Sequence, residues 1–99
     1  MSPETIADKL LELAKKLRKA LLSRDKDEIM YLLHLQDSLA MSFANLAPEL
    51  ILSDETRGKL DTFRQINEAN GMIAELRLGE VKDRIKGINP RYDGKGKLR

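Results

Sequence analysis

Apolar residues recur at steps of three and four along most of residues 6–88, and polar or charged residues fill many of the positions between them. This spacing places the apolar side chains on one face of an α-helix, whereas a half-buried β-strand requires strict alternation. Aromatic residues make up only 4% of the 99 residues, which is few for the core of a β-sandwich or barrel. The pattern therefore predicts an all-α protein, and the length allows one small domain.

The first two helices are bounded by residues that favour helix ends. Ser2 can cap a first helix, and Asp25 can cap a second one after a short interruption of the apolar period. Pro48 ends the second helix because proline disrupts a helix interior. We expect helices at about residues 3–23 and 26–47, and the short connection between them makes them antiparallel neighbours.

A third and longer helix is predicted after an apolar linker. Ser53 or Asp54 can cap it, and its apolar positions continue over residues 54–88. The expected fold is a three-helix up-down-up bundle, or a helical hairpin with a long C-terminal helix. It forms a single domain over residues 1–90, followed by a flexible basic tail over residues 91–99.

The length of this third helix has a functional implication. At about 1.5 Å per residue it spans on the order of 50 Å, against roughly 32 Å for each of the first two helices. If it is straight, Val81, Ile85 and Ile88 extend beyond the hairpin and present an apolar surface to a binding partner. The other reading is that the helix breaks at a glycine and folds back to bury these residues. The candidate positions are Gly71, Gly79 and Gly87.

The charge distribution argues against nucleic-acid binding. The net charge is +2, and residues 91–99 carry four basic residues against Asp93 alone, which gives +3 there and leaves −1 for residues 1–90. A near-neutral body with a small basic end is not the continuous Lys and Arg surface that nucleic acid requires. We expect no nucleic-acid partner.

The composition also restricts the chemistry that the chain can perform. It has no Cys and one His, so we expect no disulfide, no thiol nucleophile, no metal site and no cofactor. Charged residues in the first turns leave no apolar signal-peptide core, and no uncharged run is long enough to cross a membrane. We expect a cytoplasmic protein that does not insert into membranes and is not an enzyme.

A few polar residues and methionines stand out within the predicted helices. Asn67 and Asn70 lie beside an apolar row, where they are either solvated at its edge or buried. Buried amides would fix the register between helices or bind backbone. His34 lies off the main apolar stripe and is expected at the surface. Met30, Met41 and Met72 are typical of core gap-fillers, although methionine is also favoured on promiscuous binding surfaces. Tyr92, after a proline and among glycines and basic residues, can anchor in a partner's pocket or fold back onto the domain.

Three stretches of the chain together resemble a known family. The first is the Arg24-Asp25 pair between the first two helices, with Ile29 and Gln36 following it. The second is the run Ile66-Asn67-x-x-Asn70-Gly71-x-Ile73-x-x-x-Arg77, and the third is the ending Tyr92-x-x-x-Gly96. They resemble the FlgN-type flagellar export chaperones, which are small cytoplasmic all-helical proteins of the flagellar type III secretion pathway.

The resemblance implies a function in bacterial flagellum assembly. Such chaperones bind the C-terminal helical segment of hook-associated proteins, their cargo, and deliver it to the export gate. The implied cargo-binding residues are Asn70, Ile73, Leu76, Val81, Ile85 and Ile88. Tyr92 matches the tyrosine that docks on the cytoplasmic domain of the export-gate membrane protein. The family often has Gly directly after that tyrosine, where this chain has Asp93, and the chain is short, which leaves open a sibling class such as the filament-cap chaperones.

Two other functions are compatible with the same helices. A self-associating adaptor bundle would bury the third helix in a homodimer without any export cargo. A small helical chorismate mutase would need several Arg and Lys side chains converging on a dicarboxylate. The sequence shows no such convergence among Arg18, Arg57, Arg64 and Arg77, which fall beside the apolar stripes.

Overall fold

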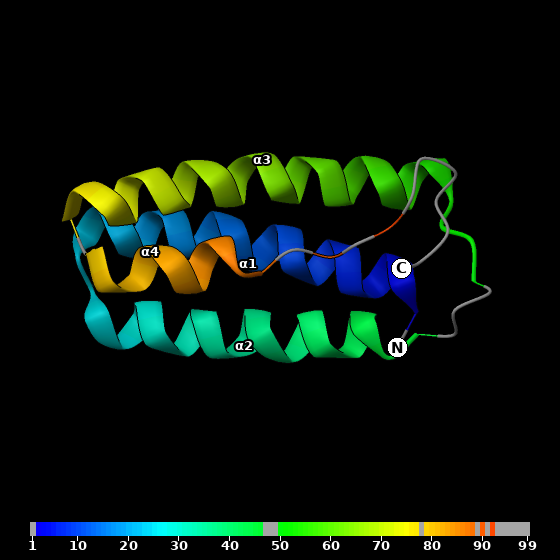
Figure 1. Ribbon diagram of the computed structural model, residues 1–99, viewed down its shortest axis with the longest axis horizontal. Helices are drawn as coiled ribbons and strands as arrows, with labels where there is room; N and C mark the ends of the chain where they lie inside the picture. Colours follow the sequence, from blue (N-terminus) through cyan, green and yellow to red (C-terminus); the bar gives the residue numbers. More distant parts are fainter. Residues whose placement is uncertain (1, 47–49, 78, 89, 91, 93–99) are drawn as a thin grey trace.

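The computed structural model describes residues 2–46, 50–77, 79–88, 90 and 92, without the side chains of residues 77 and 79–82. Within these residues the protein is all-α, as predicted, and contains no strand. The helices are α1 (Pro3–Ser23), α2 (Lys26–Ala44), α3 (Asp54–Arg77) and α4 (Gly79–Lys86). They run alternately in opposite directions along the long axis of a molecule measuring 40 × 21 × 19 Å (Figure 1).

Side-chain caps fix where the helices begin. The Ser2 hydroxyl accepts a hydrogen bond from the Thr5 N–H at 3.2 Å, and the Asp25 carboxylate accepts one from the Glu28 N–H at the same distance. Ser53, rather than Asp54, caps α3 by accepting from the Thr56 N–H at 3.1 Å. Each cap satisfies an N–H that has no partner within its helix. All three starts agree with the sequence prediction.

The turn between α1 and α2 has a left-handed residue at its centre. Arg24 has a φ of 58°, and its N–H donates to Leu21 O while the Asp25 N–H donates to Ala20 O at 3.1 Å. This pair of bonds is the Schellman arrangement, which satisfies carbonyls at a helix C-terminus and reverses the chain. It explains why two residues are enough to make α1 and α2 antiparallel.

Two predicted helix ends are wrong. The second helix ends at Ala44 instead of 47, because the Leu46 N–H turns back to Phe43 O and closes the last turn tightly. The third helix does not continue to 88: α3 ends at Arg77, α4 begins at Gly79, and α4 returns along α3. The fold-back reading is therefore correct, and the break falls beside one of the candidate glycines.

The fold-back is explained by apolar burial. Ile85 and Ile88 are almost completely buried in the core, and burying one such side chain contributes about 1.5–3 kcal/mol relative to leaving it in water. A straight helix would have exposed both. In Figure 1, α4 lies in front of α1, between α2 and the C-terminal half of α3, as the short fourth member of the bundle.

α1 supplies the centre of the core. Its buried residues are Ile6, Ala7, Leu10, Ala14, Leu17, Ala20 and Leu21. α2 and α3 both pack on this face. From the connection between them, Leu52 is buried while Ile51 is exposed. None of the described helices is long and apolar enough to cross a membrane.

Ion pairs join different helices of the bundle. The Lys59 ammonium on α3 lies 2.8 Å from Asp8 and 3.3 Å from Glu4, both on α1, and these carboxylates raise the pKa of Lys59 above its ordinary value. Arg84 on α4 contacts the carboxylate of Asp37, in the middle of α2, at 2.8 Å. The second pair holds α4 against α2.

Candidate functional site

Asn67 on α3 holds the C-terminus of α4. Its side-chain N–H group donates to Ile85 O at 2.8 Å and to Ile88 O at 3.4 Å. Carbonyls in the last turn of a helix have no partner within the helix, so a side-chain donor there acts as a cap. The other side-chain atom, Asn67 Oδ1, is buried without a hydrogen-bond partner among the described residues.

Asn70 and Gly71, close to Asn67 on α3, also help α3 to pack against the neighbouring helices. Asn70 is fully buried and donates to Ala14 O on α1 at 2.9 Å. A Cβ at Gly71 would lie 3.3 Å from carbons of the Lys86 side chain, so the glycine allows α4 to approach α3 closely. Of the two readings from the sequence, the structure shows the buried one, in which both amides bind backbone carbonyls. Asn70 contacts α1 and is not available to a cargo in this conformation, contrary to its predicted role.

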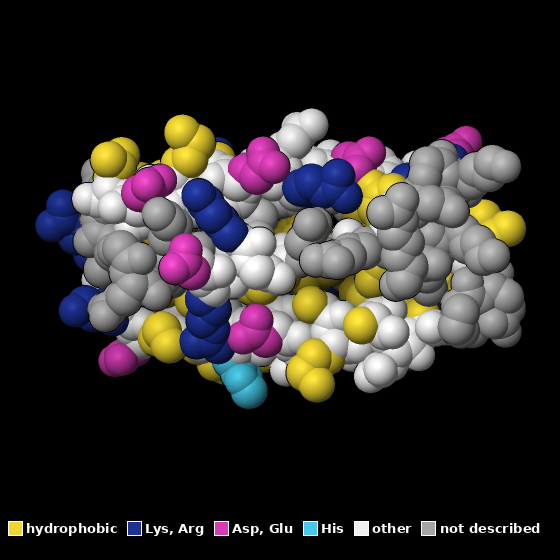
Figure 2. Space-filling model, in the orientation of Figure 1, with side chains coloured by type: hydrophobic (Ala, Val, Ile, Leu, Met, Phe, Trp, Pro, Cys, Tyr) yellow, Lys and Arg dark blue, Asp and Glu magenta, His cyan; other side chains and the backbone are white. Residues whose placement is uncertain are grey.

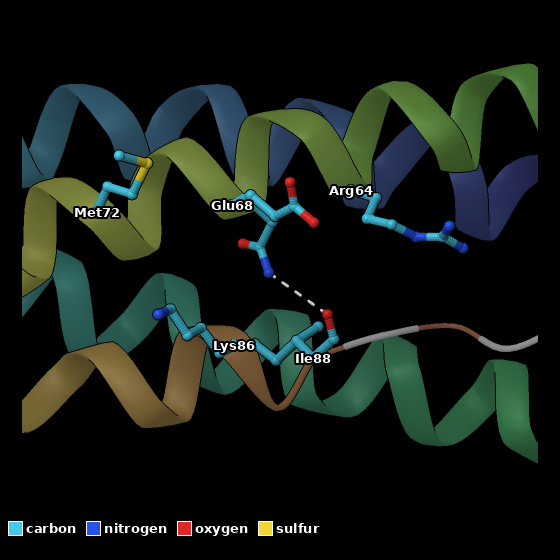
Figure 3. Close-up of a pocket in the computed structure, with 6 residues that line it drawn as sticks. Arg64, Glu68, Met72, Lys86 and Ile88 are labelled. Carbon is cyan, nitrogen blue, oxygen red and sulfur yellow. Dashed lines mark hydrogen bonds between the residues drawn. The ribbon is translucent and has the colours of Figure 1, made fainter.

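An open cavity of about 440 Å³ lies where α4 ends beside α3. Its floor is formed by the buried residues Asn67 and Ile88, and its rim by exposed side chains. The rim residues are Arg64, Glu68 and Met72 from α3 and Lys86 from α4. Three of them are spaced four residues apart, which places them in one row along α3 (Figure 3).

The charged groups of the rim do not converge on one point. Figure 3 shows the Arg64 guanidinium directed along α3 away from the Lys86 ammonium, with Glu68 between the two residues. The Arg64 guanidinium carbon lies 5.7 Å from the centre of the Tyr92 ring. The cavity therefore offers separated positive and negative groups around a floor of one amide and one apolar side chain. It lacks the clustered cations that a dicarboxylate substrate needs.

The apolar surface next to this cavity comes from the end of α3. Leu76 is 87% exposed and Met72 is 64% exposed, one helical turn apart, and Ile73 beside them is half-buried. Figure 2 shows hydrophobic side chains protruding over this end of α3. Because Met72 also lines the cavity, the exposed pair and the cavity form one surface, which we call the α3–α4 surface (Arg64, Asn67, Glu68, Met72, Ile73, Leu76, Lys86 and Ile88).

The predicted cargo-binding residues divide into two groups. Ile73 and Leu76 lie on the α3–α4 surface and are accessible. Ile85 and Ile88 belong to the core, so the prediction that they form a free apolar row is wrong for this conformation. The side chain of Val81 lies outside the described residues.

Tyr92 is folded back onto α3. Its hydroxyl donates to the Asp61 carboxylate and, at 3.5 Å, to Arg57 O, while Arg64 covers the ring. Burial raises the pKa of Tyr92 above its ordinary value, and the hydrogen bond to Asp61 raises it further. The rest of the predicted tail, residues 91 and 93–99, lies outside the described residues.

Sequence reasoning missed part of this surface. Met72 resembled a core gap-filler, yet it stands on the rim, and Glu68 and Lys86 were not singled out. The four-residue spacing of Arg64, Glu68 and Met72 could have indicated a shared face. The role of Lys86 depends on the fold-back of α4, which spacing within one helix does not reveal. His34 is exposed, as predicted.

No metal-binding group of three or more His, Cys, Asp or Glu residues occurs in the part of the chain that the structure describes. Comparison with protein-family models, with curated proteins and with solved structures finds no match for the chain.

Proposed function

We propose that the protein is a cytoplasmic binding protein that holds an amphipathic helical segment of another protein on its α3–α4 surface, as a flagellar export chaperone holds its cargo. The observation that carries this proposal is the exposure of Leu76 and Met72 beside the cavity. Large apolar side chains that stand together at the surface next to a cavity favour a partner's apolar residues. Binding of this kind requires no covalent chemistry, so in this proposal the protein is not an enzyme.

The pattern of charges on the α3–α4 surface suggests which segment would fit. An amphipathic helix would place its apolar row on Met72 and Leu76. Its polar residues would then meet the charged side chains of Arg64, Glu68 and Lys86. Helix-in-groove recognition uses anchors at positions i, i+3, i+4 and i+7 of the bound helix. The C-terminal segments of hook-associated proteins, the cargo that the resemblance implies, are the class of partner that we propose.

The experiment measures binding of this segment directly. Synthetic C-terminal segments of the hook-associated proteins encoded in the same genome are titrated with the full chain, and fluorescence anisotropy reports binding. We expect Leu76→Asp to weaken binding at least about tenfold, because a charge replaces an apolar anchor. Met41→Asp is the matched control, because Met41 is also an exposed apolar residue, at 66%, but lies on α2, away from the α3–α4 surface.

The controls separate specific recognition from general adhesion. A scrambled segment of the same composition is expected to bind neither the wild type nor the variants. If the wild type binds none of the cargo segments, or if Leu76→Asp and Met41→Asp weaken binding equally, the proposal is wrong.

We propose docking on the export gate as a second step that involves Tyr92. The ring that would enter a pocket of the gate is held by Asp61 and Arg64 in the free protein. Docking therefore exchanges these contacts for contacts with the gate. Tyr92→Ala is expected to abolish capture by the purified cytoplasmic domain of the gate, while the control Tyr31→Ala retains it. Capture that is equal for both variants would contradict this step.

A further inference from the structure

The outward face of α2 differs from the outward faces of α1 and α3. At about 100° per residue, one arc of about 120° holds Asp27 in the first turn of α2 and, C-terminal to it, seven residues of α2 and its C-cap that carry no charge. They are Met30, Tyr31, His34, Ser38, Met41, Ser42 and Asn45, and all are exposed. We call this set the α2 face. Along the lower edge of Figure 2, where α2 lies, hydrophobic side chains stand at the surface beside the single His of the chain.

The α2 face itself carries no charge, and the charged Asp27 lies on the same side of the helix one turn before it. From Ile29 to Leu46 the only charged residue is Asp37, and Asp37 is bound to Arg84 of α4 at the edge of this face. The exposed surfaces of α1 and α3, in contrast, carry many charged residues, for example Lys15, Lys16 and Glu68. A solvent-facing helix surface normally carries charged and polar residues, so this uncharged stretch is the exception in the bundle.

The exposed side chains of the α2 face are those that contact other proteins well. Tyr31 is exposed to 58%, Met41 to 66%, and Met30 to nearly half. Methionine adapts its shape to a partner and makes favourable contacts with aromatic rings. The Ser42 hydroxyl donates to Ser38 O within the helix at 3.1 Å, which leaves the face less polar than its sequence indicates.

We propose that the α2 face binds the α2 face of a second copy of this chain, in an antiparallel pair whose two-fold axis passes between the two helices at the level of residue 36. A face without charge meets itself without like-charge repulsion, and a partner with charged residues would gain no ion pair there. The antiparallel direction also brings the helix dipoles together favourably. A two-fold interface uses the same residues on both copies, so the face must complement itself.

The order of the residues along α2 meets this requirement. With the axis at position 36, residue i lies opposite residue 72 − i, so that Tyr31 faces Met41 of the partner subunit. This pairing occurs twice and places a thioether against an aromatic ring. Between these pairs, His34 lies opposite Ser38 of the partner subunit, where a ring nitrogen and a hydroxyl can share a hydrogen bond.

The first test measures the mass of the full chain against its concentration. A face of this size gives a weak dimer, and sedimentation velocity from about 5 to about 500 µM covers the expected dissociation range. We expect the wild type and Leu76→Lys to pass from monomer to dimer, and Met41→Lys to remain monomeric with an unchanged circular dichroism spectrum. A wild type that stays monomeric throughout, or a Met41→Lys variant that dimerises like it, overturns the proposal.

The second test fixes the direction of the two helices. The chain has no Cys, so single cysteines can be introduced without background. Under mild oxidation, a mixture of Tyr31→Cys and Met41→Cys chains is expected to form the mixed disulfide-linked dimer. In the antiparallel pair the two cysteines of a Tyr31→Cys dimer lie about 15 Å apart along the axis, so this variant alone is not expected to cross-link. Cross-linking of Tyr31→Cys alone, without the mixed product, overturns the antiparallel arrangement.

The dimer and the proposed cargo site are independent. Leu76→Lys addresses the α3–α4 surface and Met41→Lys the α2 face, so a failure of one proposal leaves the test of the other intact.

Discussion

Gln36 is a polar residue in an apolar position. It is fully buried at the centre of the face that α2 turns toward the core, surrounded in the helical period by Ile29, Leu32 and Phe43. Neither polar atom of its amide has a hydrogen-bond partner among the described residues. A buried polar group without a partner costs about 1–3 kcal/mol, because it loses its bonds to water and gains none.

The first prediction concerns this residue. Gln36→Met has nearly the same shape and removes the unsatisfied amide, so we expect the free energy of unfolding to rise by about 1 kcal/mol. Urea denaturation followed by circular dichroism measures the change, with Gln65→Met on the exposed face of α3 as the control. A fall of a similar size would contradict the account, since it would mean that the Gln36 amide makes favourable bonds in the folded protein.

The second prediction concerns Tyr92 and pH. Burial and the Asp61 hydrogen bond place its folded pKa above the ordinary value of 10.0. The folded state therefore holds the phenol proton more tightly than the unfolded state. The stability that follows is present below pH 10 and is lost as the pH rises through the folded pKa. We expect the contact of Tyr92 with α3 to weaken only in strongly alkaline solution.

Spectroscopy can isolate this group because the chain has two tyrosines. In Tyr31→Phe, Tyr92 is the single phenol, and its ionisation is followed by ultraviolet absorbance. The midpoint is expected at higher pH in the folded protein than in the same protein unfolded in urea. Adding Asp61→Asn is expected to lower the folded midpoint. Equal midpoints in the folded and unfolded states would show that Tyr92 is not held on α3.

At the scale of the elements, the fold-back of α4 separates residues that share one apolar row in the sequence. Ile85 is fully buried, whereas Leu76 is almost fully exposed. Ile85→Ala is expected to lower the free energy of unfolding by about 2–5 kcal/mol, and Leu76→Ala to change it by no more than about 0.5 kcal/mol. Chemical denaturation of the two variants side by side measures both values. Similar effects at the two positions would indicate that α4 does not pack as described.

Helix boundaries were predictable from the sequence only where a local residue determines them. The starts of α1, α2 and α3 were predictable because each depends on a local cap, at Ser2, Asp25 and Ser53. The burial of Asn67 and Asn70 was foreseen as one of two readings from their position beside the apolar row. The break after Arg77 was not decided by the sequence, because a continuous helix and a fold-back satisfy the same spacing.

The candidate site was predictable only in part, for the same physical reason. Ile73 and Leu76 were identified, and they are accessible on α3. Lys86 and Ile88 line the cavity, and Ile85 is buried in the core, only because α4 returns along α3. These roles depend on contacts between residues far apart in the chain, which periodicity within one helix does not describe.

At the scale of the whole molecule, the bundle presents two apolar surfaces on different helices. The α3–α4 surface mixes exposed Met72 and Leu76 with charged groups and a cavity, which suits an amphipathic segment. The α2 face is uncharged and complements itself, which suits a second copy. Because α2 and α3 lie on opposite sides of the bundle in Figure 1, a dimer through α2 leaves both α3–α4 surfaces open.

The most direct test of partner binding at the α3–α4 surface is a nuclear magnetic resonance titration of the full chain. The methyl groups of Met and Ile are labelled, and an unlabelled C-terminal segment of a hook-associated protein is added at a fixed protein concentration. We expect the signals of Met72 and Ile73 to shift progressively, while those of Ile6 and Ile29 in the core stay in place. An absence of shifts, or shifts confined to Met30 and Met41 on α2, would contradict the central claim.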